Sequence, residues 1–311
     1  TKRSSRKQTR CGTGRRQMYK NVAELLDKAK KLNVPLHEVV LRNEMLLSDL
    51  TKEQVYHRLQ KHYETMVASA TRAIMQPLEM TGNFIKGQSF KQGRYAGGKT
   101  LCGSYLNNIM TMALSCCEVN ASMGRICAAP TAGSCGILPA VLIETARELN
   151  LAQKDVLDAL LVASGFGAIF IANATVSGAE GGCQAECGVA AAIAAAAAVY
   201  MAGGTPKMCS NAVGIALMNC MGLVCDPVAG LVQLPCSFRN ASQAANAVAS
   251  ADMALAGQTA NIPTDEIIEA MYKVGKKMPS ELKETSQGGL AATPTAKKLE
   301  KKIHKISIFT E

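Results

Sequence analysis

Tryptophan is absent from this 311-residue sequence, and aromatic residues make up only 4% of it. A core filled by large rings is therefore excluded, whereas 26 glycines, 15 methionines and long alanine runs favour closely packed helices. Alternation of polar and apolar residues with a period of two is almost missing, which argues against β-strands. Since no Pro- or Ser-rich linker interrupts residues 20–300, we expect an all-α fold with a single compact helical domain.

The positive charge is concentrated outside the body of the chain. The net charge is +10, but residues 1–17 carry seven Lys or Arg and no acidic residue. We expect this segment to be a disordered basic N-terminus, because it contains almost no apolar residue that could join a core. The rest of the chain lacks a basic groove interleaved with aromatic residues, so we expect no nucleic-acid binding.

Twelve cysteines are too few for a disulfide scaffold in a chain of 311 residues, and several lie within apolar runs. This usage points to a reducing compartment, and we expect a cytoplasmic protein. The apolar stretches 157–174 and 189–202 approach the length of a membrane span, but they are rich in Ala and Gly and lack basic flanks. We expect them to be buried helices, with no membrane contact.

Apolar periodicity and capping residues predict most of the helices. Thr51 and Gln54 form a capping-box pattern at the start of one of them. Residues 81–98 are glycine-punctuated and are expected to form a loop, either purely structural or facing the substrate as a lid. Further helices are expected at 22–32, 36–47, 106–123, 138–149, 155–172 with interruptions at Gly165 and Gly167, from 189 onward, and at 208–221, 241–257 and 264–276.

A run of small residues, 130–136, leads directly into a predicted helix. Its sequence is PTAGSCG, and such a loop offers unpaired backbone N–H groups at the positive end of the helix dipole. It suits an anion of the size of a carboxylate. Capping of the helix by Thr131 or Ser134 is the structural alternative, and one residue can serve both purposes.

Three cysteines lie in loops that contain glycine or proline: Cys183, Cys225 and Cys236. A single cysteine is more often a small buried apolar residue, but a thiolate at a helix-breaking position can point away from the backbone toward a metal. An iron-sulfur cluster is favoured over zinc, because the sequence has no CxxC pair and no histidine nearby. Cys187 begins an alanine-rich helix and ranks second as a ligand. The predicted fold is therefore a helical domain with cluster-binding loops.

Several longer motifs, in this order along the chain, resemble the alpha chain of the bacterial iron-sulfur-dependent L-serine dehydratases (L-serine ammonia-lyases). The resemblance extends from about Met18 to Ile303, nearly the whole chain. The motifs are SGAEGGCQAE at 177–186, MGLVCDPVAGLV at 221–232, CSFRNA at 236–241, ADMALAG at 251–257 and QGGLAATPT at 287–295.

The resemblance implies a lyase that degrades L-serine to pyruvate and ammonia, a source of carbon for gluconeogenesis. It implies an oxygen-sensitive [4Fe-4S] cluster in place of pyridoxal phosphate, with one open iron that acts as a Lewis acid on the substrate hydroxyl. The implied cluster ligands are Cys183, Cys225 and Cys236. The implied substrate-binding residues are Thr131, Gly133, Ser134, Arg239 and Asn240.

The resemblance leaves the catalytic base unassigned. Related proteins carry a Ser-Ser-His-Thr motif in a second domain or a separate beta chain, and this sequence contains none. We therefore expect a beta subunit as partner, which supplies the base near the interface. The expected division is a catalytic domain at 18–304 and a tail at 305–311. Alternatives are β-elimination from L-cysteine or L-threonine, and a non-catalytic iron-sulfur carrier.

Overall fold

The computed structural model describes residues 17–308. Most of the predicted basic N-terminal segment and the last three residues of the predicted tail lie outside this range. Within it, the chain is 71% helical, with 13 α-helices and no strand, so the predicted all-α single domain is confirmed. The helix that ends the described range continues to Ile308, past the expected boundary at residue 304.

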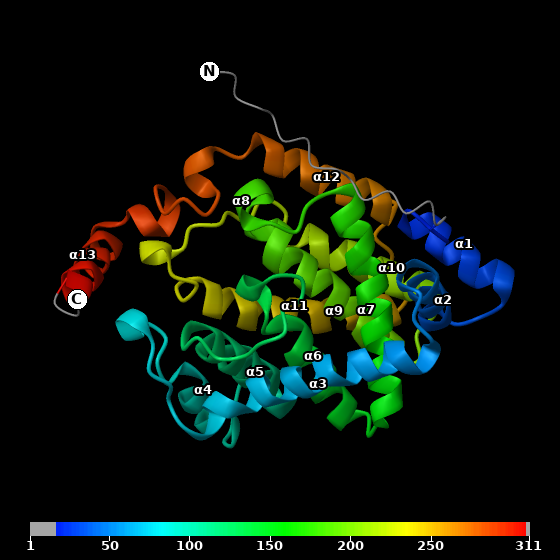
Figure 1. Ribbon diagram of the computed structural model, residues 1–311, viewed down its shortest axis with the longest axis horizontal. Coiled ribbons are helices and arrows are strands. Elements are labelled where there is room, and N and C mark those ends of the chain that lie inside the picture. Colours follow the sequence, from blue (N-terminus) through cyan, green and yellow to red (C-terminus); the bar gives the residue numbers. More distant parts are fainter. Residues whose placement is uncertain (1–16, 309–311) are drawn as a thin grey trace.

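The α-helices are joined by short connections and by three longer ones, 122–136, 219–235 and 278–293 (Figure 1). Their bounds are α1 Val22–Leu32, α2 Leu36–Ser48, α3 Lys52–Met75, α4 Gln88–Ala96, α5 Gly103–Ala121, α6 Ile137–Glu148, α7 Gln153–Asn173, α8 Gly178–Gly181, α9 Val189–Met201, α10 Pro206–Met218, α11 Cys236–Leu255, α12 Thr264–Lys277 and α13 Pro294–Ile308.

Helix α9 lies at the centre of the domain, where it packs against α6, α7, α10 and α11. Twelve of its thirteen residues are buried, and most of them are alanines. Small side chains allow the neighbouring helix axes to approach closely, which is how a core with few aromatic residues can be filled densely. Alanine also has the highest intrinsic helix propensity, so the same composition stabilises the helix itself.

Two helices of the described chain are long and apolar enough to cross a membrane by length and composition alone. One is α7, and the other spans Gln184–Met201. Inside the fold, 72% and 94% of their apolar windows are buried, respectively. Both therefore have the burial expected of core helices in a folded domain.

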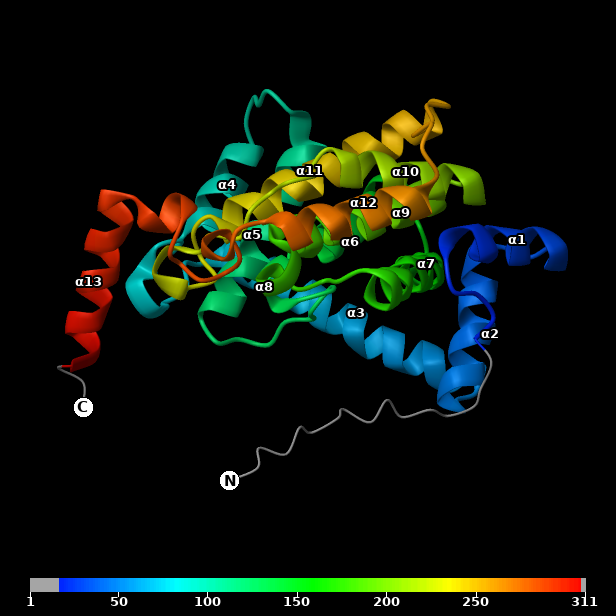
Figure 2. The ribbon, with the colours of Figure 1, turned by 90° about the horizontal axis from the view of Figure 1, so that it is seen from above.

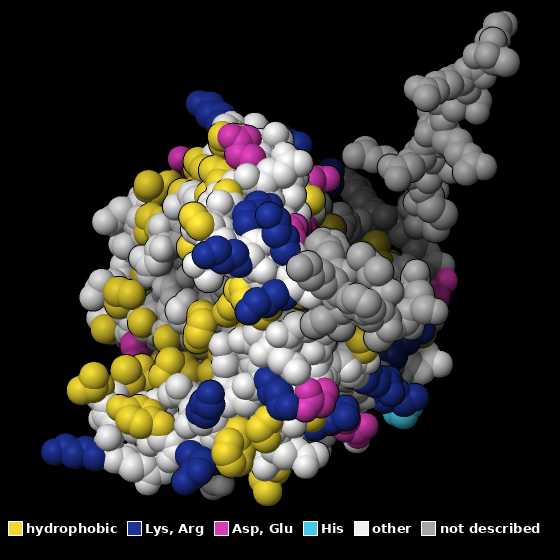
Figure 3. Space-filling model, turned by 90° about the vertical axis from the view of Figure 1, so that its left-hand side faces the viewer, with side chains coloured by type: hydrophobic (Ala, Val, Ile, Leu, Met, Phe, Trp, Pro, Cys, Tyr) yellow, Lys and Arg dark blue, Asp and Glu magenta, His cyan; other side chains and the backbone are white. Residues whose placement is uncertain are grey.

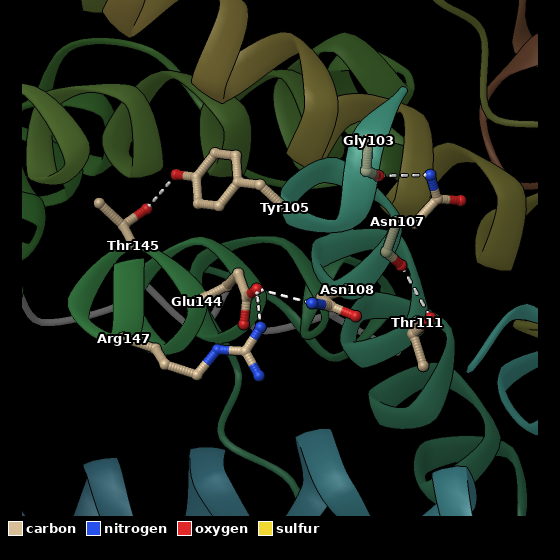
Figure 4. A network of polar contacts seen from close by, with 8 residues as sticks. All are labelled: Gly103, Tyr105, Asn107, Asn108, Thr111, Glu144, Thr145 and Arg147. Atoms are coloured by element: carbon tan, nitrogen blue, oxygen red, sulfur yellow. Dashed lines mark hydrogen bonds and ion pairs between the residues drawn. The ribbon is translucent and has the colours of Figure 1, made fainter. Parts of the chain in front are cut away.

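Helices α5 and α6 are joined by polar contacts that the sequence pattern did not indicate (Figure 4). The Tyr105 hydroxyl lies 2.7 Å from the Thr145 hydroxyl, and the Asn108 amide donates to the buried Glu144 carboxylate at 2.9 Å. Arg147 pairs with the same carboxylate from the following turn. These contacts fix α6, which begins where the 130–136 loop ends.

Two predictions of local structure are wrong. Residues 81–98 do not form a continuous loop, because α4 occupies much of this segment. The buried Glu118 carboxylate accepts hydrogen bonds from the backbone N–H groups of Gly87 at 2.9 Å and Ser89 at 2.7 Å, and so caps α4 from another helix. Helix α7 also continues without interruption through Gly165, where the missing side chain leaves room for Val40.

The loops that carry the predicted site residues adjoin α8, α11, α12 and α13 (Figure 2). They include the turn η2 (Ala132–Ser134), the π-helical turn η3 (Gln184–Gly188), and the turns η4 (Val228–Gly230) and η6 (Gly289–Ala292). Contacts of η3 with α8, α11 and η2 bring residues from three distant parts of the sequence together. The helical bundle thus supports one cluster of loops.

Candidate active site

The three predicted cluster ligands are all buried, and each comes from an interruption of the helical bundle. Cys183 lies between α8 and the π-helical turn, Cys225 forms an isolated parallel bridge with Lys283, and Cys236 begins α11. Their exposed fractions are 2%, 4% and 8%. Gly182 has a φ of 75°, a left-handed conformation that glycine adopts without strain and that allows the chain to turn before Cys183.

The three thiols influence one another electrostatically. Burial first, and then the charges of Cys183 and Glu186, raise the pKa of Cys236 to about 12. The pKa of Cys225 is raised by burial first, and then by the charges of Cys183, Glu186, Glu284 and Cys236. Without a positive charge between them, three thiolates in this place would repel one another strongly.

Cys183 differs from the other two cysteines. A hydrogen bond from the Cys187 thiol lowers the pKa of Cys183 against the effect of burial, and the positive charge of Arg239 lowers it further. Cys187 is the donor of this pair, and its own pKa is raised well above the usual range. Of the three predicted ligands, Cys183 is thus the one that ionises most readily, and the hydrogen bond from Cys187 favours its thiolate form.

Arg239 holds the Cys225 loop in place. Its guanidinium donates to the backbone oxygen of Val224 at 2.7 Å and pairs with Asp226 at 2.8 Å. Asp226 also accepts from the backbone N–H of Leu290 at 2.7 Å, which joins the loop to η6. Burial acts to lower the pKa of Arg239, but the charges of Cys183 and Asp226 raise it, so the side chain stays cationic.

Asn240 connects the loop that precedes α6 to the start of α11. Its amide NH₂ donates to the backbone oxygens of Gly133 at 2.7 Å and Cys236 at 2.9 Å, and its oxygen accepts from the Gly136 N–H at 2.9 Å. The side chain is fully buried. Asn240 therefore fixes the small-residue loop relative to Cys236, a role that its place in the sequence did not reveal.

Thr131 and Ser134 form a capping box at the start of η2. The Thr131 hydroxyl also donates to the carboxylate of Glu186. A Cβ added at Gly133 would lie 2.5 Å from the nearer Glu186 oxygen, so glycine leaves the room in which this carboxylate lies. The structure thus places a carboxylate beside Thr131, Gly133 and Ser134.

Glu186 was missed in the sequence analysis. The only signal was its position three residues after Cys183, on the same turn of a helical segment. Its exposed fraction is 8%, and burial raises the pKa of its carboxyl group above the usual range, an effect to which the charge of Glu284 adds. A buried carboxyl group with a raised pKa is a frequent feature of active sites.

Side chains from three segments converge on Gly178. A Cβ added there would lie 3.0 Å from the Cys225 sulfur, 3.2 Å from a Glu186 oxygen and 3.4 Å from a Glu284 oxygen. A thiol and two carboxylates therefore pack closely around a position that has no side chain. None of the three segments is adjacent to another in the sequence, so the convergence follows from the fold alone.

The thiols of the site fit an iron-sulfur cluster by their chemistry. Among the described residues, no three His, Cys, Asp or Glu lie close enough together to hold one metal ion. A cluster is larger than an ion and is held by thiolates that stand further apart. Three buried cysteines, two from separate loops and one from the first turn of α11, lie within electrostatic reach of one another and near Arg239, and they fit such a group.

Fold and site together define a class: an all-helical protein with a buried, thiol-lined polar site at a junction of loops. The sequence profile described as serine dehydratase alpha chain matches residues 31–291. The chain belongs to this family.

Two similar proteins have nearly the same length as this chain. The "Probable L-serine dehydratase, alpha chain" of Bacillus subtilis (strain 168) is 46% identical over 92% of this chain and 95% of its own length. The "L-serine dehydratase, alpha chain" of Peptoniphilus asaccharolyticus is 44% identical over 91% of this chain and 97% of its own length.

A third relative is longer. The "L-serine dehydratase 2" of Escherichia coli (strain K12) is 36% identical over 88% of this chain but only 61% of its own length. The relatives therefore include both proteins matched almost end to end and proteins that carry a further part.

Proposed function

We propose that this chain is the alpha subunit of an iron-sulfur-dependent L-serine ammonia-lyase, which converts L-serine to pyruvate and ammonia. Family membership is the observation that carries the proposal. The buried site supports it, since it contains thiols for a cluster and polar groups for a small zwitterionic substrate. The reducing cytoplasm is the compartment that suits an oxygen-sensitive cluster of this kind.

Cys183, Cys225 and Cys236 would hold a [4Fe-4S] cluster. When bound with one iron open, such a cluster supplies Lewis-acid assistance to the departure of the substrate hydroxyl, without pyridoxal phosphate. Arg239 lowers the cost of gathering anionic thiolates at one place, because it adds a fixed positive charge beside Cys183. The hydrogen bond from Cys187 favours the ionised form of the same ligand.

The remaining residues position the substrate. The substrate carboxylate would lie against the small-residue loop, where Thr131, Gly133 and Ser134 are held in place by Asn240. Arg239 lies beside Cys183 and adds a positive charge at this end of the site. Holding the carboxylate while the hydroxyl points toward the cysteines would orient the Cα–H bond in one direction.

The proton acceptor belongs, in this proposal, to a beta subunit. Support comes from the longer relatives, which contain a part that this chain does not match. Hydrophobic, cationic and acidic side chains are interspersed on the face at the α13 end of the molecule (Figure 3). Such a mixed surface near the site loops is compatible with a protein partner.

The test is formation of pyruvate from L-serine under strict anaerobiosis, by the reconstituted chain with its beta subunit. Cys225→Ala should abolish turnover, and Cys209→Ala, at a buried cysteine of α10, should retain it. L-threonine and L-cysteine serve as competing substrates that test the preference for serine. Turnover by the Cys225→Ala variant equal to that of the unsubstituted enzyme would refute the ligand assignment. If the spectrum of the cluster does not change on addition of L-serine, the result favours a non-catalytic iron-sulfur carrier.

A further inference from the structure

A buried carboxylate lies in the candidate site without a cation beside it. Within the described residues, the Glu186 carboxylate has one hydrogen-bond partner, the Thr131 hydroxyl, and it takes part in no ion pair. The charged group that most affects it is another carboxylate, that of Glu284. Burial of a negative charge next to a second one is unfavourable unless a positive group completes the site.

The position of this carboxylate is set by the fold. Glu186 lies on the π-helical turn, Thr131 fixes one of its oxygens, and the absence of a side chain at Gly133 leaves room for it. Its other oxygen lies close to Gly178, where the Cys225 sulfur and a Glu284 oxygen also lie. The free oxygen is thus directed at the place where the thiols and the acids meet.

The proposed substrate has three polar groups with different requirements. The hydroxyl group is directed to the cluster, and the carboxylate suits the backbone N–H groups of the small-residue loop. The α-ammonium group carries a positive charge and needs an acceptor, preferably an anion in a site that excludes water. Arg239 is cationic and Asn240 is fully used by the backbone, so neither can meet this requirement.

We propose that Glu186, with Glu284 behind it, binds the α-ammonium group of the substrate and thereby selects amino acids over hydroxy acids. This inference rests on the proposed function, because it names the partner of one group of L-serine. A carboxylate fixed by Thr131 presents its free oxygen to the ammonium group on the side of Cys225 and Glu284. Glu284 adds negative charge from the surface side and strengthens the preference for a cation.

The experiment compares two ligands on the anaerobically assembled enzyme with its beta subunit. D-serine keeps the ammonium group, whereas L-glycerate has a hydroxyl in its place. Calorimetry measures the dissociation constant of each ligand, and pyruvate release gives KM for L-serine. In Glu186→Gln, the dissociation constant of D-serine and the KM for L-serine should rise about 10- to 100-fold, while binding of L-glycerate changes less than about threefold.

Three further variants separate this role from a merely structural one. Glu180→Gln removes an exposed carboxylate on the adjacent turn and should leave both ligands unaffected. Glu186→Asp keeps the charge on a shorter side chain and should restore part of the preference for D-serine. Thr131→Val keeps the carboxylate but removes the hydrogen bond that fixes it, and should weaken D-serine about 3- to 10-fold.

The outcomes are distinct. If Glu186→Gln binds D-serine and L-glycerate in the same ratio as the unsubstituted enzyme, the inference is wrong even if turnover is lost. If Glu186→Gln does not assemble, an unchanged ratio in both Glu186→Asp and Thr131→Val overturns it equally. A failure of the unsubstituted enzyme to release pyruvate rejects the proposed function instead, and calorimetry still reports whether the ammonium group is recognised.

Discussion

Two neighbouring regions of this protein each contain buried cysteines and a buried glutamate. They differ in the secondary structure that carries these residues and in the hydrogen bonds of the carboxylate. On α5, Cys116 and Glu118 are fully buried in a regular helix, and the Glu118 carboxylate accepts two backbone hydrogen bonds. At the site, Cys183 and Cys225 come from the segments between the long helices, and Cys236 begins α11. Glu186 accepts one hydrogen bond from a hydroxyl there. The buried carboxylate of the first region therefore has a hydrogen-bond donor for each of its oxygens, and the one at the site does not.

The two regions differ in whether the buried glutamate has enough hydrogen-bond partners within the chain. Glu118 stabilises the fold, whereas the fold holds Glu186 in an unfavourable environment. Glu118 compensates its own burial, because it satisfies N–H groups that would otherwise be orphaned at the start of α4. Glu186 lies near another carboxylate, and burial raises its pKa. Burial alone does not distinguish the two; what distinguishes them is whether the buried charge has its partners within the chain.

The largest expected effect is the difference in activity between two variants, each of which replaces a cysteine in one of the two regions. Cys225→Ala should reduce serine turnover by more than about 100-fold and lower the iron bound per chain, because it removes a ligand. Cys116→Ala is the matched change, at an equally buried thiol whose partner is the Ser69 hydroxyl, 3.5 Å away. It should retain iron and most of the activity. Iron analysis and anaerobic assay check both, and equal loss in the two variants would remove the distinction between the regions.

The second-largest effect is expected on stability. Replacement of Glu118 should lower the free energy of unfolding more than replacement of Glu186. Glu118→Gln deprives the N–H groups of Gly87 and Ser89 of a charged acceptor, and should lower the free energy of unfolding by about 2–4 kcal/mol. Glu186→Gln should change it by less than about 1 kcal/mol, since it removes an unfavourable charge along with one hydrogen bond. Urea unfolding of the cluster-free chain measures both. A larger loss for Glu186→Gln would contradict the comparison.

Much of the fold could be predicted from periodicity, because the amphipathic and alanine-rich helices are determined by local sequence. The capping box at Thr51 and Gln54 is present as predicted, and α1, α2 and α12 begin where their patterns indicated. The segment that failed, 81–98, contains α4, whose first turn is capped by a residue about thirty positions away. No local pattern encodes such a contact.

The candidate site shows the same division. Cysteines in glycine- or proline-containing loops were visible in the sequence, and the structure brings Cys183, Cys225 and Cys236 within electrostatic reach of one another. Their assignment as cluster ligands stays a prediction. Glu186 could not be singled out, because its importance depends on Thr131 and Gly133, more than fifty residues away. Residues that act through tertiary neighbours need the fold before they can be recognised.

The smallest expected effect comes from two glycines, Gly136, which packs against α5, and Gly178, which lies beside Cys225 and Glu186. In Gly136→Ala the new Cβ would lie 2.5 Å from the backbone oxygen of Ala113 on α5, and since backbone cannot move aside easily, unfolding free energy should fall by about 1–3 kcal/mol. In Gly178→Ala the Cβ meets only the ends of side chains, at 3.0 Å or more, so stability should fall by less than about 1 kcal/mol. The methyl group would nevertheless occupy the space that borders Cys225 and Glu186, and KM for L-serine should rise about tenfold. Thermal unfolding and anaerobic kinetics of the two variants, measured side by side, would show whether the substrate binds beside Gly178. An unchanged KM in Gly178→Ala would mean that the substrate lies elsewhere.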